Sequence, residues 1–141
     1  MERHTSGVAT MRDLERLALA MPETEQGADA DGRVSYAVAG KTFVFHRSPR
    51  PDARDPETGE RLEDVLVFWV GDLDEKELIL SDPDGPFFTT PHWNGYPAVL
   101  IRIPRLRGLR KAELRDVVEG AWVARAPKRL AKAWLGDASN P

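Results

Sequence analysis

The chain has 141 residues, of which 41% are hydrophobic and 30% charged, a balance typical of one globular domain rather than a disordered chain. It contains no cysteine, which excludes a disulfide scaffold, a cysteine nucleophile, a zinc–thiolate site and an iron–sulfur cluster. Its apolar runs are too short for a bilayer span or a signal peptide, so we expect no membrane partner and a cytoplasmic location.

The net charge of −3 is unevenly distributed along the chain. Residues 51–85 carry 12 acidic and 3 basic side chains, a net charge of −9, whereas residues 102–135 carry 10 basic and 3 acidic side chains, a net charge of +7. A segregated basic surface can attract a polyanion within about 8–10 Å. Solvated faces of helices and loops explain the same pattern without any partner.

The first part of the chain is predicted to form a helix and a β-hairpin. Thr10, followed three residues later by Asp13, forms a capping-box pattern in front of an amphipathic helix that Pro22 ends. The polar residues 23–32 are predicted to form a loop. Residues 33–46 contain two alternating apolar runs around a Gly-Lys turn, which predicts two paired strands.

The middle of the chain alternates between loops, strands and one short helix. Residues 47–61 are rich in proline and charge, so we expect a long exposed loop that contributes to no core. The apolar run 65–70 predicts an interior strand, and Asp72 is placed to cap a short helix after it. Residues 87–90 and 98–103 are predicted to form the last two strands.

The last third of the chain is predicted to be helical. An apolar stripe at helical spacing runs through residues 110–125, and a second short helix follows the interruption at Ala126-Pro127. The stripe consists of Leu114, Val117, Val118, Ala121 and Trp122. A basic face is expected at Arg125, Lys128, Arg129 and Lys132.

These elements predict an α+β protein, a two-layer sandwich in which an antiparallel sheet of about five strands packs against helices. The predicted element order is α-β3-α-β2-α. We expect a flexible leader over residues 1–9, a single domain over residues 10–136 and a tail over residues 137–141.

No familiar catalytic or cofactor motif is present. The glycines do not have the spacing of a phosphate-binding loop, and neither H-E-x-x-H nor G-x-S-x-G occurs. The acidic residues 72–77 coincide with a helix start, where carboxylates cap free amide groups. We therefore predict no cofactor, no metal and no catalytic residues.

The segment PHWNGYP, residues 91–97, is the densest unusual segment. Its rings could stack on a ligand, or they could cover one end of the core. The first interpretation makes it a candidate ligand cleft formed by His92, Trp93, Asn94 and Tyr96.

Several segments together resemble the MmcQ/YjbR family of small bacterial proteins. These segments are ALAMPETEQG, VAGKTFVFHR, TTPHWNGYPAVLIRI and ELRDVVEGAWVARAPKRLAKAW, and the triplet His92-Trp93-Asn94 is the most family-like feature. The resemblance covers roughly residues 10–135 and implies the same element order, similar to that of secretion-chaperone-like proteins. The long acid-rich loop at 47–61 departs from shorter family members.

The resemblance implies a non-enzymatic, DNA-binding protein with a double-wing arrangement of strands and loops. Together with the basic C-terminal third, it predicts weak DNA binding through Arg102, Arg105, Arg107, Arg110, Arg125, Lys128, Arg129 and Lys132. An alternative is a chaperone-like or regulatory interaction module, monomeric or dimeric, that binds a peptide or small ligand near residues 91–97. A third class, a metal-free enzyme, would use His92 as a general base.

Overall fold

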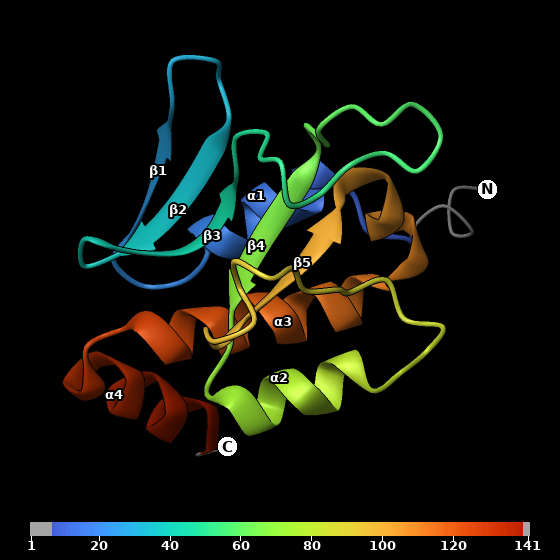
Figure 1. Ribbon diagram of the computed structural model, residues 1–141. Coiled ribbons are helices and arrows are strands. Elements are labelled where there is room, and N and C mark those ends of the chain that lie inside the picture. The colour runs from blue at the N-terminus through green and yellow to red at the C-terminus, as the bar shows by residue number, and fades with distance from the viewer. Residues whose placement is uncertain (1–6, 140–141) are drawn as a thin grey trace.

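The computed structural model describes residues 7–139, which form a five-stranded antiparallel sheet with helices against it (Figure 1). The strands lie side by side in chain order: β1 (Thr24–Ala28), β2 (Val34–Val38), β3 (Lys41–His46), β4 (Val65–Trp69) and β5 (Ala98–Arg102). The helices are α1 (Met11–Leu19), α2 (Leu73–Leu80), the 3₁₀ helix η2 (Ile103–Gly108), α3 (Lys111–Arg125) and α4 (Lys128–Ser139). The predicted α+β class and antiparallel sheet are confirmed.

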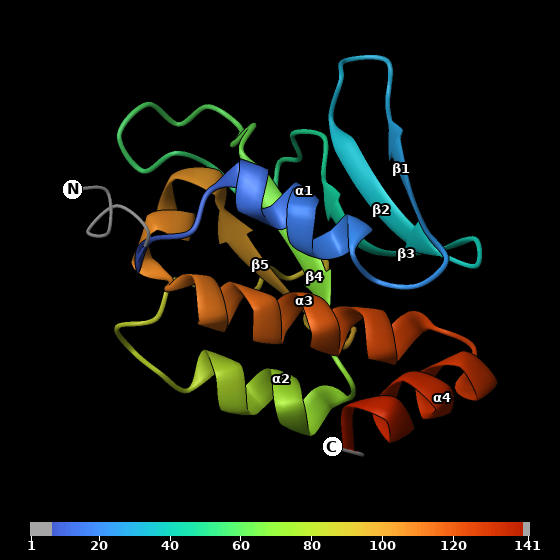
Figure 2. The same ribbon diagram turned by 180° about the vertical axis from the view of Figure 1, so that it is seen from behind.

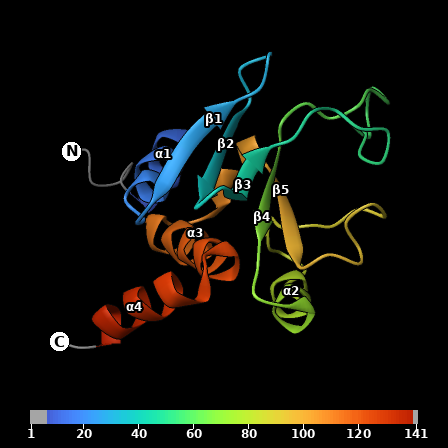
Figure 3. The same cartoon turned by 90° about the vertical axis from the view of Figure 1, so that its left-hand side faces the viewer.

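The two faces of the sheet are covered differently. Helices α1 and α3 lie together on one face, as the view from behind shows (Figure 2). In the side view, α1, α3 and α4 lie on one side of the strands, whereas the loops after β3 and before β5 lie on the other (Figure 3). We call the side without these helices the open face.

Helix α1 begins at the capping box that the sequence predicts. The Thr10 hydroxyl accepts a hydrogen bond from the Asp13 amide at 3.2 Å, and the Thr10 amide donates to the Asp13 carboxylate at 3.0 Å. The two bonds satisfy amide groups that a helix start otherwise leaves free. The helix ends at Leu19, shortly before Pro22.

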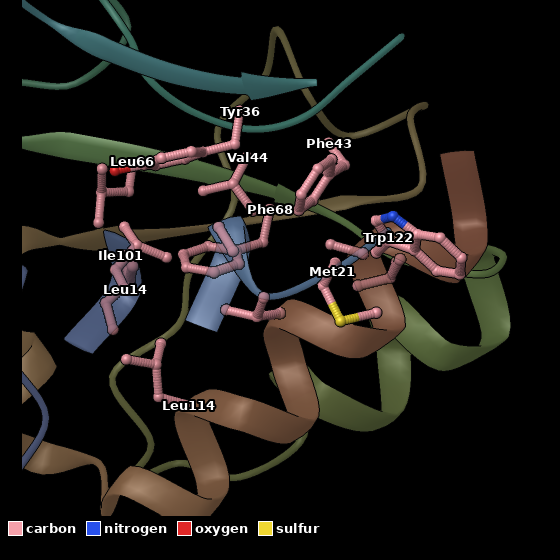
Figure 4. Close-up of a cluster of buried hydrophobic side chains, with 14 of the residues drawn as sticks. Leu14, Met21, Tyr36, Phe43, Val44, Leu66, Phe68, Ile101, Leu114 and Trp122 are labelled. Carbon is pink, nitrogen blue, oxygen red and sulfur yellow. The ribbon is translucent and has the colours of Figure 1, made fainter. Parts of the chain in front are cut away.

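The main core lies between the helices and the sheet (Figure 4). Trp122 of α3 is 0% exposed, and its indole nitrogen donates a hydrogen bond to the Pro22 carbonyl at 3.0 Å. The predicted stripe of α3 is confirmed, since its members Leu114, Val118, Ala121 and Trp122 are buried and Val117 packs partly buried against them.

A second, smaller core lies on the open face. Strand β4 contributes to both cores, because Leu66 and Phe68 pack in the first and Val65 and Val67 in the second. Burial on both faces explains why this strand is apolar throughout. The second core consists of Ala53, Leu62, Val65, Val67, Trp93, Ala98 and Leu100.

Two strand predictions differ from the structure. Residues 23–32 were predicted to be a loop, but they contain β1, which pairs antiparallel with β2. Four of the five residues of β1 are exposed, so the strand lacks the apolar alternation that would identify it. Residues 87–90 form only an isolated bridge between Phe88 and Leu100.

The loop 47–61 and the chain ends also differ from expectation. Ala53 of the loop is 7% exposed and belongs to the second core, so the prediction of a loop outside any core is wrong at this position. Ala9 is buried, and its amide donates to the Leu109 carbonyl at 3.0 Å, whereas residues 1–6 of the predicted leader lie outside the described residues. Helix α4 extends into the predicted tail, of which residues 140–141 lie outside the described part of the chain.

Candidate functional site

A groove of about 530 Å³ lies on the open face of the sheet, beside the hairpin of β1 and β2. The sheet presents one side to it, and residues 46–50 and 92–93 close it from the other. Its apolar lining is Ala28, Val34, Phe45 and Trp93, and its polar lining is Asp29, Arg33, Ser35, Thr42, His46, Arg47, Ser48, Arg50 and His92. We call this cavity the groove.

Arg33 lies at the hairpin end of the groove, where two carboxylates neutralise it. Its guanidinium lies 3.3 Å from an Asp29 oxygen and 3.0 Å from an Asp31 oxygen. Hydrogen bonds from the backbone amide of Arg33, together with those from Asp31 and the Arg33 side chain, lower the pKa of Asp29. The turn of the hairpin therefore fixes this ion cluster at one end of the groove.

Arg47 and Arg50 line the groove on the side of the loop after β3, which we call the loop end, and both lie near one carboxylate, that of Asp52. The Arg47 Nη2 and Asp52 Oδ1 atoms are 3.2 Å apart, and the Arg47 side chain is 3% exposed. Burial raises the pKa of Asp52. The neighbouring Thr90 hydroxyl and the charges of Arg47 and Arg50 lower it by more, so the pKa of Asp52 lies below its usual value. Because two guanidinium groups lie near a single carboxylate, this end of the groove carries a net positive charge.

The wall of the groove at Arg47 contains buried polar side chains. Arg47 pairs with Asp52, and the Thr90 hydroxyl interacts with the same carboxylate, whereas the Trp93 indole nitrogen has no hydrogen-bond partner among the described residues. A buried polar group without a partner costs about 1–3 kcal/mol.

Trp93 is the centre of an aromatic cluster that borders the groove. Its ring centroid lies 6.2 Å from that of Phe45, 5.8 Å from Trp69, 5.4 Å from His92 and 5.4 Å from Tyr96. Most of these contacts are edge-to-face, the favoured arrangement of aromatic pairs. The cluster holds the groove wall in place.

Lys76 of α2 fixes the segment 91–97 from the opposite side. Its side chain is buried, and its ammonium group donates hydrogen bonds to the carbonyls of Trp93 and, at 2.7 Å, Tyr96. Burial lowers the pKa of Lys76. An N-capped helix thus positions the segment that carries Trp93.

The predicted ligand cleft is divided by the structure. His92 and Trp93 line the groove, whereas Asn94 lines a separate recess beside Lys76 and accepts a hydrogen bond from the Thr89 hydroxyl at 3.2 Å. Tyr96 is 48% exposed and stacks on His92. Half of the predicted cleft therefore belongs to the groove.

Three of the predicted nucleic-acid contacts are engaged within the protein. Arg102 makes two hydrogen bonds of 3.0 Å with the Asp64 carboxylate. Arg125 donates to the Thr42 carbonyl at 3.0 Å and lies 4.2 Å from the ring centroid of Trp69. Arg110 caps α3 and lies 3.6 Å from the Glu113 carboxylate.

The other predicted cations are exposed and separate into two clusters. The η2 cluster is Arg105 and Arg107, and the α4 cluster is Lys128, Arg129 and Lys132. They lie beyond opposite ends of α3, whose 15 residues span about 22 Å (Figure 1). The structure therefore does not join them into one continuous surface.

Sequence reasoning missed the arginines of the groove. Arg33 follows the hairpin turn, and Arg47 and Arg50 follow β3, so residues separated in the chain meet only after the hairpin folds beside the loop. In the described part of the chain, no three His, Asp or Glu side chains are grouped to hold a metal ion. None of the helices between residues 7 and 139 has the length and apolar character to cross a membrane.

The chain is similar to known proteins over most of its length. The chain is 32% identical over 134 residues to an uncharacterized protein of Mycobacterium bovis, Mb2600, covering 92% of this chain and 98% of that protein. The uncharacterized proteins MT2646 and Rv2570 of two Mycobacterium tuberculosis strains match with the same identity and coverage. The model of the YjbR family matches residues 19–124, from the end of α1 almost to the end of α3. Since this match contains the whole sheet, α2 and the aromatic segment, the chain belongs to the YjbR family.

Proposed function

We propose that the protein is a non-enzymatic binding module that holds a small ligand in the groove. The observation that carries this proposal is a cavity of about 530 Å³ lined by both apolar and charged side chains. Binding sites for small molecules have volumes of about 300–1,000 Å³ and combine an apolar lining with a few fixed polar groups.

The surroundings of the groove support a preformed site. One wall is held by the aromatic cluster around Trp93 and by Lys76, and another by the ion cluster at Arg33. A site whose side chains are fixed before binding loses little conformational entropy when a ligand arrives. The open face therefore offers a rigid receptor and not a surface that must reorganise.

A groove-filling substitution tests the proposal. Ser35 lines the groove, and its hydroxyl faces Gly27 on the paired strand β1. The ring of Ser35→Phe should fill the groove, and it has room because Gly27 carries no side chain. We expect compounds from a panel of small aromatic acids, amides and amines to raise the melting temperature of the parent, and Ser35→Phe to abolish that shift.

The matched control is Ala112→Phe, which adds the same ring to an exposed position of α3. It should keep the shift of the parent. A panel that stabilises neither protein, or that stabilises Ser35→Phe as much as the parent, would contradict the proposal.

A second candidate function is weak DNA binding, supported by the α4 cluster. Lys128, Arg129 and Lys132 are exposed, and none of them forms an ion pair with a carboxylate of residues 7–136, the residues whose side chains the structure describes. Two of the acidic residues in 51–85 pair with other arginines, Asp52 with Arg47 and Asp64 with Arg102. The α4 cluster is therefore available to phosphates.

A fluorescence titration of labelled duplex DNA tests this candidate. Non-specific binding should have a dissociation constant of about 10⁻⁴ to 10⁻⁶ M. With three phosphate contacts, the logarithm of the affinity should fall against the logarithm of the salt concentration with a slope of about −3. The triple substitution Lys128/Arg129/Lys132→Ala should remove most of the binding, whereas Arg105/Arg107→Ala should remove less. Equal binding by the triple variant and the parent, or no binding at low salt, would exclude this function.

A further inference from the structure

The three arginines that line the groove differ in their partners. At the hairpin end, Arg33 is matched by Asp29 and Asp31. At the loop end, Asp52 is shared between Arg47 and Arg50, and only Arg47 lies within ion-pair distance of it. Arg50 is exposed, lines the groove, and has no ion pair with any carboxylate between residues 7 and 139. The loop end therefore carries an uncompensated guanidinium group.

Small polar side chains surround this guanidinium group. Ser48 and His92 also line the groove. The Nε2 of His46 donates to the Glu63 carbonyl at 2.6 Å, a bond that fixes the ring beside Arg47. A guanidinium group flanked by hydroxyl and imidazole groups is suited to two oxygens of one planar or tetrahedral anion.

The remainder of the groove is apolar and favours a ligand with a flat hydrophobic body. Phe45 and Trp93 supply its aromatic side chains, and both pack with the second core. Trp93 is 9% exposed and Phe45 is partly buried, so their edges and not their full faces are accessible. A cavity of about 530 Å³ accommodates a bicyclic ring with an acidic substituent.

We propose that the groove binds an organic anion, an aromatic or similarly flat apolar body bearing a carboxylate or phosphate group that Arg50 anchors. The inference rests on the proposed function and adds the ligand class. The anionic group lies at the loop end of the groove, and the apolar body lies against Phe45 and Trp93.

Three probes of one shape test the ligand class. 2-Naphthoate and 2-naphthyl phosphate carry the two anionic groups on the same ring, and 2-naphthamide replaces the carboxylate with a neutral group of equal size. Isothermal titration calorimetry should give dissociation constants for at least one anion about tenfold lower than for the amide. Comparison of the two anions distinguishes a carboxylate ligand from a phosphate ligand.

The anchoring role of Arg50 is tested by substitution. Arg50→Ala should bring the affinity for the anions to within about threefold of that for the amide while leaving the amide affinity unchanged. Arg50 is exposed in a loop, so this variant is expected to fold. Arg107→Ala removes an exposed arginine of η2, far from the groove, and should change neither affinity.

The outcomes separate this inference from the proposed function. Equal affinities of the parent for all three probes would overturn the anion preference but leave the groove as a binding site. An equal loss in Arg107→Ala and Arg50→Ala would also overturn it, because the effect would then come from net charge. If no probe binds the parent and the panel of compounds produces no thermal shift, both the inference and the proposed function fail.

Discussion

Trp122 combines two interactions in one side chain, which makes it a sensitive test of the main core. Its ring is fully buried between α3 and the sheet, and its indole nitrogen bonds to the Pro22 carbonyl after α1. Trp122→Ala should lower the free energy of unfolding by about 3–5 kcal/mol, as large core truncations do. Urea denaturation measures this loss.

The matched variant is Trp122→Phe, which keeps an aromatic ring and removes the hydrogen bond to Pro22. It should lose clearly less stability than the alanine variant, since less apolar volume is removed. A loss below about 1 kcal/mol for Trp122→Ala would be the size of a surface effect and would contradict the packing of α3.

Asp13 links the helix cap to the acid stability of the protein. Burial raises the pKa of Asp13, but hydrogen bonds from Arg16 and Thr10 and the charge of Lys111 outweigh it, so that the folded pKa lies below 3.8. A lowered folded pKa means that the stabilisation is present above about pH 4 and is lost as the pH falls through the folded pKa.

The variant Asp13→Asn should therefore be less stable than the parent by about 1 kcal/mol at pH 7. Thermal unfolding across pH 2–7 should show the two proteins converging at the acid end, where the parent carboxyl is also neutral. A difference that stays constant with pH would show that the charge of Asp13 is not responsible.

At the scale of elements, the loop 47–61 has two parts with different roles. Ala53 packs in the second core, and an isolated bridge joins Arg54 to Arg61. Residues 55–60 beyond the bridge form a local turn, in which the Asp55 carboxylate accepts a hydrogen bond from the Glu57 amide at 2.7 Å. The base of the loop, up to the bridge between Arg54 and Arg61, is therefore part of the fold, whereas its tip, residues 55–60, packs in neither core.

Replacement of residues 55–60 by Asn-Gly should leave the stability within about 1 kcal/mol of the parent. Two such residues can connect an antiparallel pair through a type I′ turn, here between Arg54 and Arg61. Ala53→Asp, which places a charge in the second core, should cost more than about 2 kcal/mol in the same denaturation experiment. Similar losses for both variants would contradict this division of the loop.

At the scale of the molecule, the two faces of the sheet follow different principles. The face under α1 and α3 is a continuous apolar core, whereas the open face combines a small core with a groove and an incompletely paired polar wall. The first face carries the main core, and the second carries the groove that we propose as the binding site. Lys76 and Arg125 extend from the helices to the open face, where they contact the Trp93 carbonyl and the Trp69 ring.

The same division explains what the sequence could predict. The capping box at Thr10, the stripe through Trp122 and the helix cap at Asp72 depend on neighbours within one or two turns, and all three are present. Strand β1 escaped prediction because it is an exposed edge strand held by backbone pairing with β2. The groove escaped it because Arg33 and Arg50 become neighbours only through that pairing and the loop fold.

Arg102 shows how a charge can mislead when its partner is distant in the chain. From the sequence it belongs to a basic segment, but in the fold it is held by Asp64, 38 residues earlier. Nothing in the local pattern around either residue indicates this pair. A count of basic residues therefore overestimates the charge that this part of the chain can offer to a phosphate.

Strand β4 also has a consequence for how the chain folds. Strand β4 is apolar on both faces. If it slipped by one residue against β5, Leu66 and Phe68 would move to the open face, and Val65 and Val67 would move to the main core. This exchange would expose little apolar surface to water. The contrast between polar and apolar side chains therefore cannot select the correct register of β4 and β5. The register depends instead on side-chain size and on the two hydrogen bonds between Arg102 and Asp64. A chain with neutral residues at both positions would lose this polar marker and refold more slowly, through trapped species with shifted strands.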